Sequence, residues 1–281
     1  MFVVSKGVPV QFVSDDDFVN DWPEADACIV DLYQYDDQYY GILKSKYQKI
    51  IIFDDIRFHV PLEVSAVINN NIYANASDYP SHIKCFVGPM YYLLRQEFFG
   101  KHVLSDAQNV LVSMGGSDPE GQTMRIVEIL LKITSRHINV VFGSGKPIEN
   151  LGAILTHPQV TFYTVVSKIS LLMERAAYCV SGAGSMIYEL IYMGVPIACF
   201  SLSKNQRLIA KTLSAMNALL YLGHYNEIND SIIYEKLKGI DVRKDSRERM
   251  VKNATGLIDE KGSGRLAQEL TNWVYYGKAE I

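Results

Sequence analysis

The 281-residue sequence has no long apolar run and no excess of basic charge. No apolar run reaches the ~18 residues that a membrane-spanning helix requires, so we expect no membrane span. The 27 basic residues stand against 31 acidic residues, which gives a formal net charge of −4. Proteins that bind a nucleic-acid backbone normally carry a basic excess, so we expect no nucleic-acid partner. Internal repeats and low-complexity tracts are also missing, which excludes solenoid architectures.

Cysteine is scarce, and the placement of the cysteines argues against disulfides. Each of the four lies in an apolar, strand-like run and none forms a CxxC pair: Cys28, Cys85, Cys179 and Cys199. This pattern is typical of reduced core residues in a cytoplasmic protein. His59, His82 and His224 fall in loop-like stretches without the spacing of metal ligands. We therefore expect a cytoplasmic protein with no metal and no other cofactor.

Short apolar runs alternate with helical patterns along the chain. The runs are continuous, which is typical of strands covered on both faces in parallel sheets. Helical patterns lie between many of them, such as Thr123–Lys132, Ser170–Ala177 and Met186–Met193. Strands that alternate with helices predict a doubly wound α/β fold. The predicted strands are Val10–Val13, Ala27–Asp31, Ile50–Phe53, Val64–Ile68, Val110–Met114, Ile138–Phe142, Val160–Tyr163, Tyr178–Ser181 and Pro196–Phe200.

The pattern predicts two Rossmann-like halves with a boundary near residue 103. The second half is the more regular, because Val110 to Phe200 contains five strand candidates. In the first half, Asn69 to Pro89 is rich in Asn, Ser, Tyr and Pro and is interpreted as a loop. We predict domains at 1–102 and 103–281. Two such halves normally bind a ligand between them, at the carboxyl ends of the strands.

One glycine turn follows the predicted strand Val110–Met114, with the sequence Gly115-Gly116-Ser117-Asp118-Pro119. The two glycines permit a tight turn and a close approach of the backbone to a ligand. Asp118 is a plausible N-cap, with Pro119 at the first helical position. The free N–H groups of such a turn can hold a phosphate. A well-capped turn without a ligand explains the pattern equally well.

A second glycine turn, Gly182-Ala183-Gly184-Ser185, precedes a predicted helix that ends before Gly194-Val195-Pro196. A small-residue turn ahead of a helix is an anion site, because its first N–H groups are unpaired and the dipole favours negative charge. Glu189 lies four residues after Ser185 and can accept hydrogen bonds from both hydroxyls of a ribose. The alternative is a solvated carboxylate that interacts only with the helix dipole.

Polar residues also follow other predicted strands. Asn205 and Gln206 come after Pro196–Phe200, and Asn205 either caps the next helix or faces the ligand. Asp31, Asp54 and Asp55 come just past two strands of the first half. All three acids are expected near the ligand, and for Asp54 and Asp55 the alternative is the cap of a helix or turn, which is the commoner role of such residues.

Taken together, these motifs resemble one family. Their order and spacing are similar to those of UDP-2,4-diacetamido-2,4,6-trideoxy-β-L-altropyranose hydrolase of pseudaminic acid biosynthesis, and of similar proteins of bacterial surface-polysaccharide and spore-coat pathways. The resemblance extends over roughly residues 8 to 225. It also includes Asp31-x-Tyr33, the Asp54-Asp55 pair, the stretch Asn71 to Tyr79, Gly88-Pro89-Met90-Tyr91 and Leu93-Leu94-Arg95-Gln96-Glu97-Phe98.

The resemblance implies a two-domain glycosyltransferase-B fold in which the second half holds the UDP of a UDP-sugar. It implies metal-independent hydrolysis at the anomeric carbon with inversion, which releases UDP and a free amino-deoxy sugar. Tyr33 and Asn205 match the assisting tyrosine and asparagine of the family. The UDP-binding residues implied are Gly115, Gly116, Ser117, Gly182, Gly184, Ser185, Glu189 and Gln206. The residues expected on the sugar side are Asp31, Asp54, Asp55 and Tyr91.

The sequence departs from the family pattern near its start. It has no Gly-x-Gly-His turn, whose histidine acts on the water or the leaving group, and Leu32 stands where the family often has histidine. Val10–Val13 resembles the family's second strand, so we expect the first domain to lack its first strand and most of a helix. Three functions stay open: a UDP-sugar hydrolase, a glycosyltransferase of the same fold that uses a UDP-sugar donor, and an inactive UDP-sugar-binding homologue. The oligomeric state is not readable from the sequence.

Overall fold

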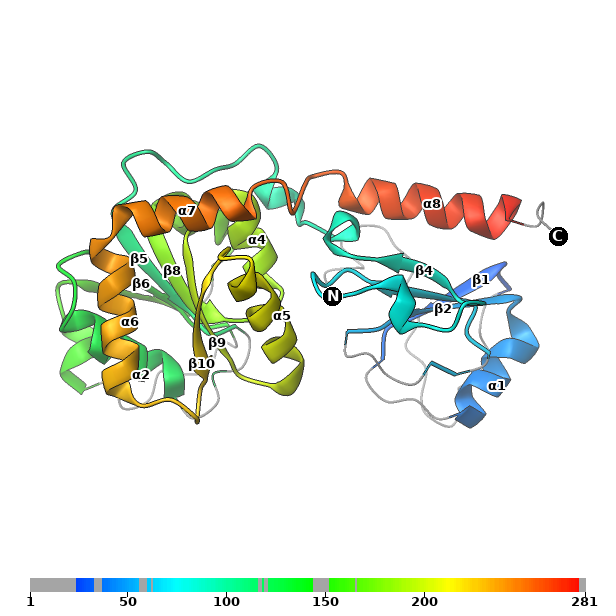
Figure 1. Cartoon of the computed structure of the whole chain (residues 1–281), viewed down its shortest axis with the longest axis horizontal. Coiled ribbons are helices and arrows are strands. Elements are labelled where there is room, and N and C mark those ends of the chain that lie inside the picture. The colour runs from blue at the N-terminus through cyan, green and yellow to red at the C-terminus, as the bar shows by residue number, and fades with distance from the viewer. Residues whose placement is uncertain are drawn as a thin grey trace.

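The protein is described from a computed structural model that covers residues 24–32, 37–55, 60–61, 63–115, 118, 121–143, 152–164 and 166–277. It forms two lobes, each built on a parallel sheet (Figure 1). The predicted α/β class with two parallel sheets is confirmed. The predicted strand Val10–Val13 lies outside the described residues.

The first lobe contains a four-stranded parallel sheet in the order β1-β2-β3-β4. Its strand β2 is buried on both faces, as the continuous apolar run predicts. Ile50 and Ile52 pack on the side of helix α1 (Asp37–Lys46), whereas Ile51 packs on the opposite side. The strands are β1 (Ala27–Val30), β2 (Lys49–Phe53), β3 (Ala66–Asn69) and β4 (Lys84–Val87). One short 3₁₀ turn, Ala76–Asp78, lies between β3 and β4, and two more follow β4, at Pro89–Tyr91 and Gln96–Phe98.

The second lobe contains a six-stranded parallel sheet in the order β10-β9-β8-β5-β6-β7. Helices cover both faces of the sheet (Figure 1). The strands are β5 (Asn109–Ser113), β6 (Ile138–Val141), β7 (Val160–Tyr163), β8 (Ala176–Gly182), β9 (Ile197–Ser201) and β10 (Leu220–His224). The helices are α2 (Gln122–Leu131), α3 (Ser170–Glu174), α4 (Met186–Met193), α5 (Lys204–Ala215), α6 (Asp230–Val242) and α7 (Lys244–Ala254), with a 3₁₀ turn at Gly152–Thr156.

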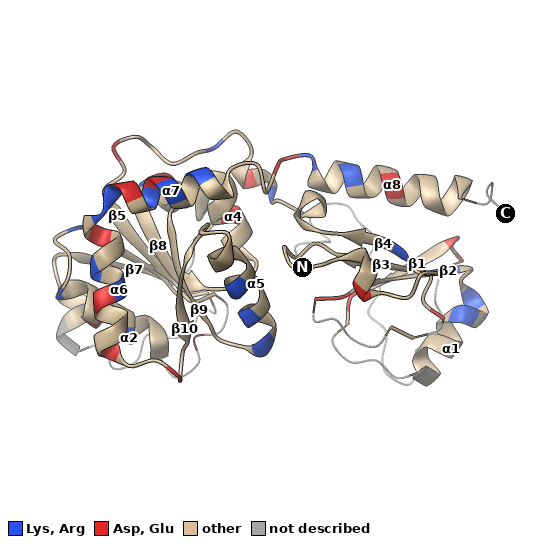
Figure 2. Cartoon of the chain, in the orientation of Figure 1, with Lys and Arg blue, Asp and Glu red and all other residues tan. Residues whose placement is uncertain are grey.

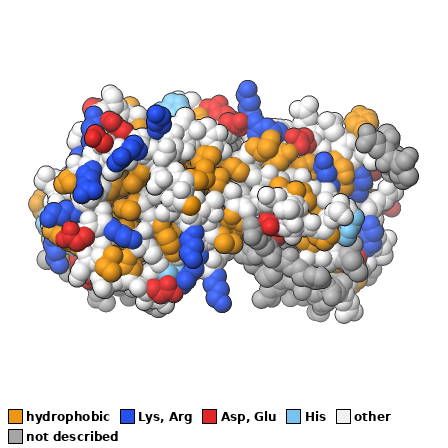
Figure 3. Space-filling view, in the orientation of Figure 1, with side chains coloured by type: hydrophobic (Ala, Val, Ile, Leu, Met, Phe, Trp, Pro, Cys, Tyr) orange, Lys and Arg blue, Asp and Glu red, His pale blue; other side chains and the backbone are white. Residues whose placement is uncertain are grey.

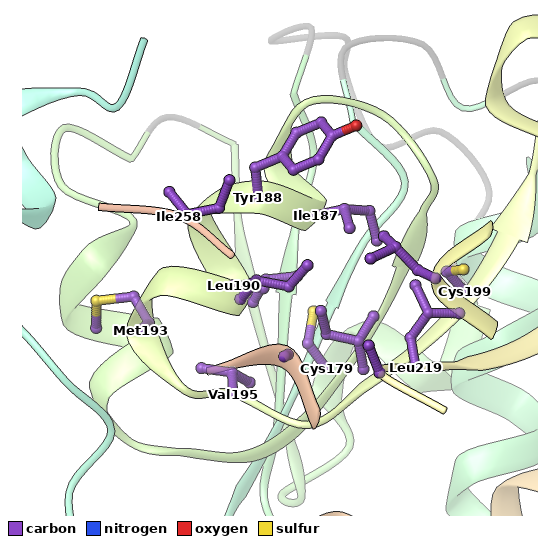
Figure 4. Close-up of a cluster of buried hydrophobic side chains, with 14 of the residues drawn as sticks. Cys179, Ile187, Tyr188, Leu190, Met193, Val195, Cys199, Leu219 and Ile258 are labelled. Carbon is purple, nitrogen blue, oxygen red and sulfur yellow. The ribbon is translucent and has the colours of Figure 1, made fainter. Parts of the chain in front are cut away.

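Helix α4 is the most deeply buried helix near the junction of the lobes. Figure 4 shows its side chains Ile187, Leu190 and Met193 among Cys179 and Cys199 of the sheet. Residues of the connection from the first lobe join the same cluster, including Tyr92, Leu94 and Phe98. The core of the second lobe therefore includes side chains that follow β4 in the sequence.

Helix α8 (Gly262–Tyr276) crosses back to the first lobe and covers one face of its sheet (Figure 1). Leu266 and Trp273 pack with Ile51 and Phe86, and Lys49 Nζ donates to the carbonyl oxygen of Trp273 at 2.6 Å. The predicted division at residue 103 assigns this helix to the second domain, whereas its packing belongs to the first sheet.

Several predicted elements differ from the structure. Strand β4 lies inside the stretch interpreted as a loop, and β10 was not predicted. The predicted helix Ser170–Ala177 ends at Glu174, because the chain enters β8 at Ala176. Asp118 is not the N-cap of α2, since Gly121 holds that position with φ of 68°. The Asp118 carboxylate still accepts the Thr123 N–H of the first turn, at 3.1 Å.

Candidate functional site

Strands β5 and β8 form the topological switch point of the second sheet. From β5 the chain moves outward through β6 to β7, whereas β8, β9 and β10 lie on the other side of β5. In open α/β sheets, ligands bind outside the carboxyl ends of the strands at such a point. Ser113 and Ser181 are partners in register, so the glycine turns that follow β5 and β8 emerge side by side.

The two turns require glycine for different reasons. Gly115 has a φ of +88°, a conformation that L side chains rarely adopt. A methyl group added to Gly182 would lie 3.0 Å from the carbonyl oxygen of Met114 and 2.9 Å from Leu202 Cδ1. The backbones after β5 and β8 therefore approach each other closely. Gly116 and Ser117, predicted to bind phosphate, lie outside the described residues.

The N-terminus of α4 opens at the same edge of the sheet. Gly184 is half-buried, and Ser185 is exposed at the position before the helix. The Ile187 N–H donates to the Gly184 carbonyl at 3.1 Å, so the amides before Ile187 are the first N–H groups of the helix. These groups and the positive end of the helix dipole form the arrangement that holds phosphate.

Helix α5 lies against this turn. Gln206 Oε1 accepts the Leu202 N–H at 2.9 Å, and its Nε2 would be 3.6 Å from a methyl group on Gly184. Ser203 is the N-cap residue of α5, so Asn205 lies inside the first turn and is not the cap. Asn205 Oδ1 accepts the Gln206 N–H at 3.0 Å and a hydrogen bond from the Ser203 hydroxyl.

Basic residues lie along α5, on the side of the second lobe that faces the first (Figure 2). They are Lys204, Arg207 and Lys211. The space-filling view shows lysine and arginine side chains projecting at this edge (Figure 3). Arg207 pairs with Glu227 and holds the pKa of that carboxyl below its ordinary value. The remaining positive charge favours an anionic ligand near the glycine turns.

Glu189 lies on the first turn of α4, and only 7% of its side chain is exposed. Arg95, from the connection after β4, binds it as a two-pronged pair. Arg95 Nε donates to Glu189 Oε1 at 2.6 Å, and Nη2 donates to Oε2 at 2.9 Å. Hydrogen bonding to Glu189 raises the pKa of the guanidinium further above its ordinary value.

A chain of buried hydrogen bonds joins α4 to the carboxyl ends of β2 and β3. The Tyr188 hydroxyl points out of the apolar cluster (Figure 4), donates to Asn71 Oδ1 at 3.1 Å and accepts the Ile72 N–H at 3.0 Å. Asn71 Nδ2 donates to Asn69 Oδ1 at 3.0 Å. The carboxyl edge of the first sheet therefore faces the N-terminal part of α4.

The same chain continues to Asp54, which is 1% exposed. Asn69 Nδ2 donates to the Tyr79 hydroxyl at 3.0 Å, and that hydroxyl donates to Asp54 Oδ2 at 2.8 Å. Burial is the main cause that raises the pKa of Tyr79, and the nearby Asp54 adds to it. Asp54 thus accepts the hydrogen bond of Tyr79 beneath the surface of the first lobe.

The other residues expected on the sugar side lie in different surroundings. Asp31 is exposed after β1, and the Asp55 carbonyl accepts the Tyr73 hydroxyl at 2.5 Å. The Tyr91 hydroxyl donates to Glu269 of α8 at 2.7 Å, and burial raises the pKa of Tyr91 to about 12. In this structure the hydroxyl of Tyr91 therefore binds helix α8. Tyr33 lies outside the described residues.

Sequence reasoning missed three residues that meet at this junction. The Tyr92 hydroxyl donates to the Ser185 carbonyl at 2.9 Å, and its ring centroid is 4.7 Å from that of Tyr188. The sequence singles out Arg95 only as part of the motif from Leu93 to Phe98, and it does not single out Tyr188 or Tyr92. A polar or aromatic residue on an otherwise apolar helix face, such as Tyr188, was the available signal.

Other features of the described residues do not point to a second centre of chemistry. No group of three or more His, Cys, Asp or Glu side chains is placed to hold a metal ion within this part of the chain. None of its helices is long and apolar enough to cross a membrane. A cavity of about 530 Å³ lies at the opposite edge of the second sheet, where β8 starts at Ala176 and Pro196 precedes β9.

Two curated proteins are similar to this chain in sequence. Spore coat polysaccharide biosynthesis protein SpsG of Bacillus subtilis is 25% identical over 226 residues, which cover 76% of this chain and 66% of that protein. Uncharacterized protein MJ1062 of Methanocaldococcus jannaschii is 25% identical over 201 residues, which cover 65% of this chain and 41% of that protein. The chain thus spans less than two thirds of the length of both relatives. No family model matches it.

Solved structures resemble the chain at low sequence identity. MurG of Acinetobacter baumannii superposes with a TM-score of 0.58 at 12% identity, over 80% of this chain and 67% of that chain. UGT89C1 of Arabidopsis thaliana, complexed with UDP, gives 0.58 at 13% identity, over 85% and 70%. The glycotransferase of kitacinnamycin gives 0.57 at 18% identity, over 75% and 55%. With its two parallel sheets and this likeness, the chain has the two-domain glycosyltransferase-B fold.

Proposed function

We propose that this chain binds a UDP-sugar at the carboxyl edge of its second sheet and hydrolyses it. The observation that carries the proposal is the pair of glycine turns at the switch point between β5 and β8, with Glu189 one turn into α4. In general, the N-terminal amides of a helix can hold a phosphate, and a nearby carboxylate can accept hydrogen bonds from the two hydroxyls of a ribose.

The finer proposal gives each residue a role. Gly184 and Ser185 hold the diphosphate at the start of α4, Gly115 lets the neighbouring turn approach it, and Gln206 fixes the turn that they share. Glu189 accepts hydrogen bonds from the ribose hydroxyls. The sugar extends toward the first lobe, and the reaction is assisted by Asn205 of α5 and by Tyr33. A water attacks the anomeric carbon opposite the diphosphate, and the bond to the diphosphate oxygen breaks to release UDP and a free amino-deoxy sugar.

The spore coat polysaccharide protein supports a role in the synthesis of surface polysaccharide, because it is similar over three quarters of this chain. The motif resemblance to the hydrolase of pseudaminic acid biosynthesis favours hydrolysis without a metal or another cofactor. A glycosyltransferase is the second candidate. The fold is shared with MurG and the kitacinnamycin glycotransferase, and a transferase differs only in the group that receives the sugar.

The binding part of the proposal is tested by calorimetric titration with UDP. We expect micromolar binding by the wild type and a loss of at least about tenfold in Glu189→Ala, because a hydrogen bond to a charged group contributes about 1.5–3 kcal/mol. Lys244→Ala, an exposed residue of α7, is the matched control and should bind UDP unchanged. A folded wild-type protein that does not bind UDP would contradict the proposal.

The reaction is tested with UDP-sugars in the presence and absence of acceptors. Release of UDP together with a reducing sugar, without any acceptor, supports the hydrolase. Release of UDP only when a lipid or saccharide acceptor is present supports the glycosyltransferase instead. UDP binding without release under either condition would identify an inactive UDP-sugar-binding homologue.

A further inference from the structure

Arg95 is the feature of this site that the proposed function leaves unused. It comes from the connection after β4, and its guanidinium binds a carboxylate on helix α4 of the second lobe. The side chain of Glu189 is 7% exposed, whereas that of Arg95 is 55% exposed. The pair is therefore buried on the carboxylate side and open on the guanidinium side.

Residues before and after Arg95 in the sequence hold its segment against the second lobe. Arg95 Nη1 also pairs with Glu97 Oε1 at 2.8 Å, so Glu189 and Glu97 together use three guanidinium nitrogens. Tyr92, three residues earlier, donates to the Ser185 carbonyl at the start of α4. Leu94 and Phe98 pack into the core of the second lobe. These contacts hold Arg95 in one place relative to α4.

The pairing with Arg95 does not use every acceptor site of the Glu189 carboxylate. A carboxylate has about four acceptor sites, two on each oxygen. Arg95 uses one site on each oxygen, which leaves one site on each oxygen for a donor such as a ribose hydroxyl. The flat guanidinium fixes the plane of the carboxylate, which the point charge of a lysine does not. It also supplies the opposite charge that a buried carboxylate requires.

We propose that Arg95 is a positioning residue that orients Glu189 to bind both ribose hydroxyls, so that the connection after β4 sets the selectivity of the second lobe for ribonucleotides. This inference rests on the proposed binding of UDP. It names the selected ligand class as a uridine diphosphate whose ribose carries both hydroxyls, in preference to its 2′-deoxy form.

The test compares the affinities of each variant for UDP and for 2′-deoxy-UDP by calorimetry. The wild type should bind UDP about tenfold to a hundredfold more tightly, since the deoxy form leaves one charged acceptor site empty. Arg95→Lys keeps the charge but loses the two-pronged geometry, and should reduce this ratio to about threefold or less. Arg95→Ala should do the same with a larger loss of UDP affinity. Lys244→Ala should keep the wild-type ratio.

The ratio separates positioning from a merely structural role. A variant that is only less stable, as judged by its thermal unfolding, weakens binding of both nucleotides equally and leaves the ratio unchanged. Such an unchanged ratio in folded Arg95→Lys, or tighter UDP binding by it, would overturn the inference and leave the proposed function intact. A wild type that binds UDP without preferring it over 2′-deoxy-UDP would overturn the inference alone. A wild type that binds neither nucleotide would overturn the proposed function and the inference with it.

Discussion

Gly182 and Gly184 stand two residues apart in the turn after β8, but their surroundings differ. Gly182 is enclosed, because an added methyl group would lie within 3.0 Å of the Met114 carbonyl oxygen and of Leu202. Gly184 meets only the end of the flexible Gln206 side chain, at 3.6 Å. The first glycine is therefore required by packing, whereas the second leaves space beside the first amides of α4.

The two alanine substitutions should consequently separate stability from binding. Gly182→Ala should lower the free energy of unfolding by about 1–3 kcal/mol, because the methyl group overpacks the turn. Gly184→Ala should change it by less than about 0.5 kcal/mol but weaken UDP binding at least about tenfold, since the methyl group projects where phosphate is expected. Urea unfolding and calorimetric titration measure the two quantities. Equal loss of stability in both variants would contradict this assignment.

At the same scale, sequence reasoning was limited by distance along the chain. Glu189 could be identified from its place one turn after a glycine turn, which is a local pattern. Its partner Arg95 could not, because the two residues are separated by 94 positions and meet only once the connection after β4 packs against α4. The hydrogen bond between Tyr188 and Asn71, which are separated by 117 positions, was missed for the same reason. Asn205 was predicted to follow a strand, but the choice of Ser203 as the cap depends on backbone angles that the residue types do not determine.

At the scale of elements, continuous apolar runs predicted the buried strands well. Strand β7 (Val160–Tyr163) and helix α4 (Met186–Met193) have the predicted bounds, because each is a run flanked by clear turn residues. Strand β4 was missed because it starts with the exposed Lys84 and lies in a stretch whose Asn, Ser, Tyr and Pro content is typical of a loop. Strand β10 contains Gly223 with φ of 135° and a register irregularity, so its apolar pattern is interrupted.

Helix α8 stabilises the lobe that precedes it by more than 200 residues in the chain. Lys49 Nζ lies 4.4 Å from the centre of the Trp273 ring and also binds the carbonyl oxygens of Trp273 and Val274 near the helix end. A methyl group on Gly262 would overlap the Tyr92 carbonyl oxygen, so the helix starts in close contact with the connection. These contacts couple the end of the chain to β2 and to the segment that carries Arg95.

Replacing Trp273 should therefore destabilise the first lobe specifically. Trp273→Ala removes a half-buried ring and should cost about 2–4 kcal/mol, somewhat below the value for a fully buried tryptophan. We expect faster amide hydrogen exchange in β2 and β3, measured by mass spectrometry, with little change in β5 and β8. Tyr276→Ala, at a position 72% exposed, is the control. Uniform exchange in both lobes would show that α8 does not stabilise the first lobe selectively.

At the scale of the whole molecule, the sequence predicted two α/β halves, and the structure has two parallel sheets. The return of α8 to the first lobe was not predictable, because an amphipathic helix does not specify which sheet it covers. The middle of the polar chain from Asp54 to Tyr188, which is formed by Tyr79, Asn69 and Asn71, lies in a stretch that resembles a loop by composition. Both features depend on how the lobes pack, which local periodicity does not encode.

The tyrosines at the junction predict how stability depends on pH. Burial is the main cause that raises the pKa of Tyr79, Tyr92 and Tyr188 above the ordinary value of 10.0. In the unfolded chain these hydroxyls ionise near that ordinary value, whereas in the folded protein they keep their protons. Above about pH 10 the unfolded state therefore binds fewer protons, and the free energy of unfolding falls as the pH rises.

Each such tyrosine should contribute a loss of about 1.4 kcal/mol per pH unit above its ordinary pKa. The buried thiols of Cys179 and Cys199, whose pKa values burial also raises, start the decline near their ordinary value of 9.0. We expect a constant urea midpoint from about pH 7 to about pH 8.5 and a steepening fall above it. Tyr188→Phe should be less stable at neutral pH, because Asn71 and Ile72 lose their partner, but its stability should fall less steeply. Parallel declines in the wild type and the variant would mean that Tyr188 ionises in the folded protein, and hence that the lobes separate enough to admit water to its hydroxyl.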